Sequence, residues 1–130
     1  MIFPQLIEFS DIGLFLLRLA IGISFLVHGS QKLAMWKMKP SEQMPSGMLN
    51  LMRFLSITEL LGGLAIIAGF LTQLAALGFV VIMAGAIYFK VFVWKKKFSE
   101  AGGWELDLIL LAASLVILFS GGGLIALLSR

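Results

Sequence analysis

Residues 50–94 read NLMRFLSITELLGGLAIIAGFLTQLAALGFVVIMAGAIYFKVFVW. Two apolar stretches, 50–69 and 73–94, each contain about the 20 residues that an α-helix needs to cross the ~30 Å hydrocarbon core of a bilayer. The connection between them, 70–72, is so short that the chain must turn back on itself at once. The stretch therefore predicts an antiparallel pair of membrane-spanning helices.

Two further apolar stretches flank this pair, which gives four predicted spans at about 12–35, 50–69, 73–94 and 104–120. The remaining connections, 37–49 and 95–103, are polar and contain Pro or Gly, so they are predicted to be loops. The sequence thus predicts an all-α integral membrane protein with four transmembrane helices in an antiparallel up-down-up-down bundle. Because the spans and their connections use the whole chain, we expect one domain over residues 1–130.

The composition agrees with this class: 60% of the residues are hydrophobic, 13% are charged and the mean hydropathy is +1.04. So few charged side chains cannot cover the surface of a water-soluble domain. We expect the lipid bilayer to surround the chain, and we expect no nucleic-acid partner. The absence of cysteine excludes disulfides and thiolate metal sites, and a single histidine is a weak metal signal, so no metal site is expected.

The distribution of basic residues predicts the orientation in the membrane. The two loops on one side carry five lysines: Lys37, Lys39, Lys95, Lys96 and Lys97. The opposite side carries only Arg130, beside Glu8 and Asp11. Because cytoplasmic loops are enriched in Lys and Arg, we expect both loops in the cytoplasm and both termini outside.

Ionisable residues within the spans are numerous for so short a chain: Arg18, His28, Lys32, Arg53, Glu59, Lys90, Glu105 and Asp107. A charge at the centre of a membrane helix costs about 2.5–3.5 kcal/mol, so each needs a partner or a purpose. The basic residues near the cytoplasmic helix ends, Lys32, Arg53 and Lys90, are interpreted as reaching the lipid headgroups. Glu105 and Asp107 lie at the start of the fourth helix, where carboxylates favour the positive helix end, and a site role for them is equally open.

Arg18 and Glu59 lie deeper, so headgroup contact does not explain them. Arg18 is about 9 Å inside the first span, and Glu59 is near the middle of the second. An ion pair between the two side chains is geometrically reasonable. Such a pair would either line a functional cavity or only hold two helices together, and a protonated Glu59 is the remaining alternative.

The first span has one face of small and ionisable residues, because spacings of three and four residues bring Arg18, Gly22, Phe25, Gly29 and Lys32 together. Its glycines favour close approach of another helix backbone, and the same interpretation applies to Gly62 and Gly63 in the second span. His28 flanks this face. Two roles remain open for it, a proton donor to a bound ligand or a satisfied core histidine.

Motifs along the chain resemble those of one family. Arg18-x3-Gly22-x6-Gly29-x2-Lys32 resembles the opening motif of the DoxX family. Glu59-x2-Gly62-Gly63-Leu64, followed by Gly69-x2-Thr72-x2-Ala75-Ala76, is similar to its second-helix block and hairpin. Gly103-x-Glu105-Leu106, with Gly121-x-Gly123, resembles its last block. The resemblance covers residues 17–123, and the tail 124–130 departs from it because the Ser-Leu-Asp-like ending of many members is missing.

The resemblance implies a four-helix protein of a bacterial or archaeal cytoplasmic membrane. Some members are named for a subunit of a thiosulfate:quinone oxidoreductase, and others are linked to oxidative-stress complexes. Carried over by position, the recurring charged residues of the family fall on Arg18, Lys32, Glu59 and Glu105. Quinone is then the implied ligand, held without a covalent bond.

Two hypotheses of function follow. The first is a membrane subunit of a quinone-linked oxidoreductase system, with a polar cavity between the first, second and fourth helices and the ligand-binding candidates Arg18, His28, Lys32, Glu59 and Glu105. The chain has no evident redox centre, so electrons would come from a redox partner protein and catalysis by this chain alone is not expected. The alternative is a non-enzymatic membrane protein that binds a lipid-like ligand or assists assembly of a partner complex. Association with a second copy of the chain stays open.

Overall fold

The computed structural model describes residues 2–125. Its elements, in chain order, are the 3-10 helix η1 (Pro4–Phe9), α1 (Ser10–Lys32), the 3-10 helix η2 (Leu33–Trp36), α2 (Ser46–Ala68), α3 (Thr72–Tyr88), the π-helical η3 (Phe89–Val93) and α4 (Glu105–Ser120). No strand occurs within this described part, so the predicted all-α class is confirmed.

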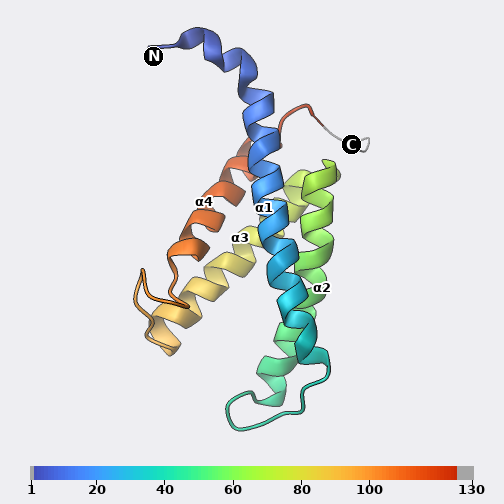
Figure 1. The fold of residues 1–130 in the computed structure, drawn as a ribbon, viewed down its shortest axis with the longest axis vertical. Helices are drawn as coiled ribbons and strands as arrows, with labels where there is room; N and C mark the ends of the chain where they lie inside the picture. Colours follow the sequence, from blue (N-terminus) through green and yellow to red (C-terminus); the bar gives the residue numbers. More distant parts are fainter. Residues whose placement is uncertain (1, 126–130) are drawn as a thin grey trace.

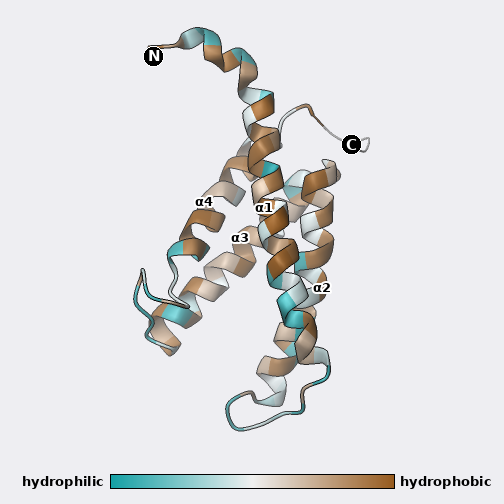
Figure 2. Ribbon diagram, viewed as in Figure 1, coloured by the Kyte–Doolittle hydropathy of each residue, from teal (hydrophilic) through white to brown (hydrophobic). Residues whose placement is uncertain are grey.

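Three continuous helical segments are long and apolar enough to cross a membrane: Pro4–Trp36, Ser46–Ala68 and Thr72–Val93. They correspond to the first three predicted spans. The fourth predicted span forms α4, whose 16 residues extend about 24 Å and fall short of the ~30 Å hydrocarbon core. Figure 2 shows that apolar residues dominate the helices, while hydrophilic residues gather in the loops and at a few positions along the helices.

The helices are arranged as two antiparallel pairs. α1 packs chiefly against α2, and α3 packs chiefly against α4, whereas α1 and α4 make few contacts. The pairs approach one another near the α2–α3 hairpin and the end of α4, and they spread apart toward the two longer loops (Figure 1). The loop lysines therefore lie at the end of the molecule where the two helix pairs diverge.

Glycines allow the close contact between α1 and α2. A Cβ atom added at Gly22 would lie 2.9 Å from the carbonyl oxygen of Gly63, and one added at Gly63 would lie 2.9 Å from that of Gly22. Further along the same interface, a Cβ at Gly29 would lie 3.0 Å from the carbonyl oxygen of Ser56. The interpretation of these glycines as sites of close helix packing is confirmed.

The hairpin between α2 and α3 is as tight as the sequence predicts. α2 ends at Gly69, whose φ of 82° lies in the left-handed region that glycine adopts without strain. The Gly69 amide donates to the Ala65 carbonyl, as does the amide of Phe70. α3 then begins at Thr72, so the polypeptide reverses within three residues.

A buried apolar core joins the two helix pairs. Phe25 of α1 and Phe79 of α3 stack with their ring centroids 3.6 Å apart. Around them are the buried residues Ile21, Ile66, Ala76, Met83, Leu110 and Ile117. Many large apolar side chains on the outer surface remain exposed, for example Phe54, Leu61 and Phe119, as expected for helices that face lipid.

Candidate functional site

Lys32 and Glu59 form an ion pair between α1 and α2. The ammonium nitrogen of Lys32, in the last turn of α1, lies 2.7 Å from each carboxylate oxygen of Glu59. Glu59 is fully buried in the middle of α2, and the side chain of Lys32 is 24% exposed. Lys32 therefore neutralises the deepest carboxylate of the chain, and its interpretation as a headgroup-contacting lysine is wrong.

Lys90 and Asp107 form a second ion pair, between η3 and α4. The Lys90 ammonium lies 2.7 Å from Asp107 Oδ2 and donates to the carbonyl oxygen of Gly103 at 3.2 Å. Lys90 belongs to the π-helical turn that ends the third span, and such turns are frequent at functional sites. The interpretation of Lys90 as a headgroup-contacting residue is therefore also wrong.

Arg53, the third basic residue interpreted in that way, instead caps the end of η2. It donates to the carbonyl oxygens of Met35 and Met38, at 2.9 and 2.7 Å. Trp36 beside it donates its indole N–H to the hydroxyl of Ser56 at 2.8 Å. These contacts hold the start of the first loop against α2.

A cavity of about 610 Å³ lies between α1, α2 and α3 and reaches the start of α4. We call it the ligand cavity. Its wall is mostly apolar, with Met, Leu, Phe and Val side chains from η2, α2, α3 and η3, whereas α1 contributes only polar and ionisable residues. The polar and ionisable residues that line it are His28, Gln31, Lys32, Glu59, Lys90 and Asp107. Both ion pairs therefore border the same cavity.

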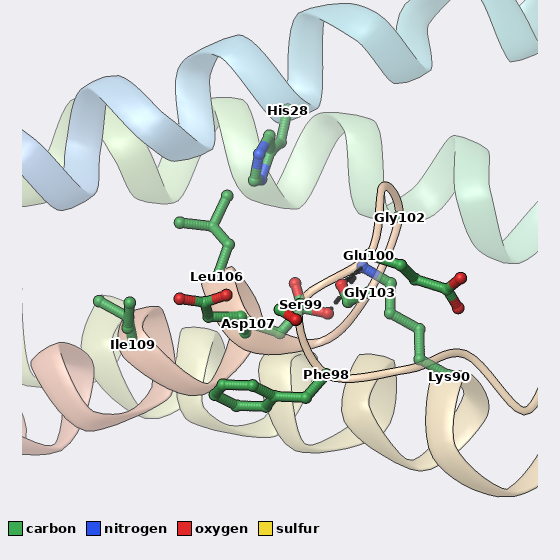
Figure 3. Close-up of a pocket in the computed structure, with 11 residues that line it drawn as sticks. His28, Lys90, Phe98, Ser99, Glu100, Gly102, Gly103, Leu106, Asp107 and Ile109 are labelled. Carbon is green, nitrogen blue, oxygen red and sulfur yellow. Dashed lines mark hydrogen bonds and ion pairs between the residues drawn. The ribbon is translucent and has the colours of Figure 1, made fainter.

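A second cavity of about 400 Å³, open to the outside, lies between α1, the loop before α4 and the first turn of α4. We call it the loop-side vestibule. Figure 3 shows the His28 ring pointing from α1 toward this space, opposite Leu106 and Asp107. Ser99, Glu100 and Glu105 also line it, and its wall is proportionally more polar than that of the ligand cavity. His28, Lys90 and Asp107 line both cavities.

His28 lies between the two ion pairs. It is half-buried, and its ring meets that of Phe25 edge-on with centroids 6.3 Å apart. It is close enough to interact electrostatically with all four charged groups of the two pairs. Within residues 2–125 its side chain makes no hydrogen bond, so its ring nitrogens can bind a guest molecule.

Arg18 lies at the opposite end of the molecule from this site. It is about 15 Å from His28 along α1, because ten residues separate the two. Its buried guanidinium donates to the carbonyl oxygens of Ile66 and Ile67 at the end of α2, and to those of Gly122 and Ile125 after α4. We call this set of contacts the Arg18 clasp. It holds α1 and α2 together with residues 121–123, the glycine turn that follows α4.

The ligand-binding candidates are thus divided by the structure. His28, Lys32 and Glu59 line one cavity, Glu105 lines the adjoining vestibule, and Arg18 lines neither. The Arg18–Glu59 ion pair does not occur, since among the described residues the ion pairs are those of Lys32 and Lys90. The expected cavity between the first, second and fourth helices is instead walled mainly by α1, α2 and α3.

Lys90 and Asp107 stand out in the sequence as ionisable residues within the spans, but their pairing was not predicted. Each has an ordinary explanation in isolation, because lysines reach headgroups and carboxylates favour helix starts. Both residues lie near the same side of the membrane, at the end of the third span and the start of the fourth. This similar depth could have indicated that the two side chains pair. Within residues 2–125 no cluster of three or more His, Asp or Glu residues is able to hold a metal ion.

Fold and site together define a helical membrane protein with two ion pairs and a histidine beside a mostly apolar cavity. The DoxX family model matches residues 13–94, which is more than half of the chain, and the chain therefore belongs to the DoxX family. The matched part includes Arg18, His28, Lys32, Glu59 and Lys90 but ends before α4. Comparison with curated proteins and with solved structures found no match.

Proposed function

We propose that this chain is the membrane subunit of a quinone-linked oxidoreductase system and that it holds the quinone in the ligand cavity. The observation that carries the proposal is the combination within one cavity of apolar walls, two ion pairs and His28. Its volume of about 610 Å³ is in the range of small-molecule sites. The occupant should therefore have an apolar body and a small polar head.

A quinone has both features. Its carbonyl oxygens accept hydrogen bonds, and Lys32, Lys90 and His28 are the donors that border the cavity. Its apolar tail would lie against the side chains of α2 and α3, such as Leu55 and Val81. The ion pairs hold both lysine side chains in place beside the cavity, because each lies 2.7 Å from a carboxylate oxygen.

The chain contributes binding and orientation in this proposal, and a partner contributes the electrons. The sequence has no cysteine and one histidine, so no cluster or thiol pair of its own could store electrons. A redox partner protein in or on the membrane is therefore part of the proposal.

The proposal includes a fourth span and a defined orientation. α4 is 16 residues long, and a helix shorter than the hydrocarbon core is accommodated by local thinning of the bilayer or by its neighbours. α3, its main neighbour, is part of a segment long enough to cross. The lysine-bearing loops then lie in the cytoplasm and the termini outside.

The decisive experiment is mass spectrometry of the organic extract from protein purified in mild detergent, next to an equally hydrophobic control protein. We expect a stoichiometric quinone in the wild type, loss of it in Glu59→Gln, and retention in Thr58→Val. Thr58 is the matched control, because its hydroxyl bonds only to the Phe54 carbonyl of its own helix and lines neither cavity. Unchanged quinone, activity and stability in Glu59→Gln would show that the site is misassigned.

A lipid-like ligand, with an assembly role and no redox chemistry, is the second candidate. The predominance of apolar side chains in the cavity wall favours it, since an acyl chain fits such a wall as well as an isoprenoid tail does. An extract that contains only bulk phospholipid would support this candidate over the quinone.

A further inference from the structure

The ligand cavity and the loop-side vestibule meet at His28. Three residues, His28, Lys90 and Asp107, line both spaces. The vestibule is open and has the more polar wall, so water can enter it, whereas the ligand cavity is walled mostly by apolar side chains. His28 thus lies at the boundary between the water-accessible vestibule and the mostly apolar ligand cavity.

We propose that His28 transfers protons between water in the loop-side vestibule and the polar head of the molecule in the ligand cavity. This inference rests on the proposed quinone-binding function and adds the proton route to it. Its basis is geometric, namely the position of one imidazole on the boundary of two cavities (Figure 3).

Among the three shared residues, His28 is the one suited to this task. Lys90 and Asp107 are bound to each other, and a proton leaving Lys90 or reaching Asp107 would break a buried pair. His28 has two ring nitrogens, so it can give a proton from one and regain one at the other.

The charged groups that face His28 come from every neighbouring element. They are Lys32 of α1, Glu59 of α2, Lys90 of η3 and Asp107 of α4, with Glu100 and Glu105 on the vestibule wall. The four nearest groups form two neutral pairs. A proton added to His28 is therefore not opposed by an unbalanced positive charge next to it.

Reduction of a quinone to a quinol takes two electrons and two protons. The electrons come from the redox partner protein, and the protons come from vestibule water by way of His28. After each transfer to a quinone oxygen the imidazole takes another proton from water, so it ends the cycle unchanged.

The first arm of the test needs no ligand and measures access of water to His28. Because the chain has one histidine, deuterium uptake at the imidazole Cε1 carbon, measured by mass spectrometry, reports on His28 alone, provided that the purification tag lacks histidine. Leu106→Trp narrows the vestibule, whereas Leu108→Trp changes an exposed residue of the same helix that lines neither cavity. We expect several-fold slower uptake in Leu106→Trp and wild-type uptake in Leu108→Trp.

The second arm measures proton delivery in the full-length protein in lipid nanodiscs. A short-chain ubiquinone is bound, dithionite supplies the two electrons, and quinol formation is followed optically. Quinol formation is measured at saturating ubiquinone, so that a loss of affinity on removal of the His28 donor does not enter the rate. We expect bound ubiquinone in His28→Gln to form quinol about 100-fold more slowly than in the wild type, the usual size of a lost proton-transfer group. Ser30→Ala is the control, because its hydroxyl bonds to the Val27 carbonyl of its own helix outside both cavities.

The two arms separate the inference from the function on which it rests. A wild type that binds no ubiquinone would overturn the proposed function, while the uptake of deuterium still tests the vestibule route. Bound ubiquinone reduced at the wild-type rate in His28→Gln would overturn the proton route alone. Equal deuterium uptake in the wild type and Leu106→Trp would do the same.

Discussion

The ammonium nitrogen of Lys32 lies 2.7 Å from both carboxylate oxygens of Glu59, and this ion pair joins α1 to the middle of α2. Glu59 is fully buried, so its charge is tolerated only because Lys32 compensates it. The pair lies on the wall of the ligand cavity. It therefore holds the first helix pair together and also places a charged donor beside the cavity.

Breaking this ion pair should destabilise the protein. We expect Glu59→Gln to lower the free energy of unfolding by about 2 kcal/mol, below the loss at a fully buried pair because Lys32 is 24% exposed and can turn outward. The double variant Lys32→Met with Glu59→Met should recover most of this loss, since it leaves no charge without a partner. Unfolding in mixed micelles with increasing SDS measures all variants. A double variant as unstable as the single one would contradict the prediction.

The Arg18 clasp should depend on the shape of the guanidinium and not only on its charge. Arg18→Lys keeps the charge but cannot reproduce a planar donor set that reaches carbonyls of both α2 and the glycine turn. We expect a loss of about 3 kcal/mol in the same SDS titration, because buried carbonyls lose charged donors. Arg53→Lys is the matched control and should cost about 1 kcal/mol, since that side chain is only half-buried. Equal losses would argue against a special role of the clasp.

The close contact of α1 and α2 should not accept a methyl group. In Gly22→Ala the new Cβ would overlap Ile67 Cγ1 and lie 2.9 Å from the Gly63 carbonyl oxygen, so the helices must separate. We expect a destabilisation of about 1–3 kcal/mol. Gly78→Ala in α3 has no atom within 4 Å of the new Cβ and should be neutral or stabilising by up to about 1 kcal/mol. Thermal unfolding of the detergent-solubilised variants, followed by circular dichroism, distinguishes the two.

The fourth span can be tested by cysteine labelling, because the chain has no cysteine of its own. In intact cells we expect a membrane-impermeant maleimide to label Gln5→Cys and Ser120→Cys but not Gln43→Cys or Ala101→Cys. After the cells are permeabilised, the maleimide should label Gln43→Cys and Ala101→Cys as well. Labelling of Ala101→Cys and Ser120→Cys from the same side would show that α4 does not cross the membrane.

Much of the fold could be predicted because hydropathy and turn chemistry are local properties. Length and apolar character identified the three long spans, and the three-residue connection identified the α2–α3 hairpin. The predicted fourth helix, 104–120, agrees with α4, but its 16 residues are fewer than an ordinary span has, so that α4 crosses the membrane stays a prediction. The splaying of the two helix pairs was not predictable, since it depends on which faces pack together and by how much.

The candidate site was predicted in part. His28, Lys32 and Glu59 were identified as ionisable residues in the spans, and all three line the ligand cavity. Arg18 was grouped with them because it lies deep in the first span, because a pair with Glu59 was geometrically reasonable, and because it shares a helix face with Lys32. A shared face does not mean a shared depth, and Arg18 lies about 21 Å from Lys32 along α1.

The sequence by itself determined the class of protein, the antiparallel hairpin and the set of charges that need partners. The tertiary structure alone decided which charges meet. The contact of Gly22 with Gly63 sets the register of α1 against α2, so Arg18 lies level with Ile67, about 12 Å from the level of Glu59. Helical side chains lean toward the N-terminus of their helix, which carries Arg18 away from Glu59 but brings Lys32 and Glu59 toward each other. The pairing of the charged residues thus depends on the register of α1 against α2 and on the direction of the side chains. Neither can be predicted from the spacing of residues along a single helix.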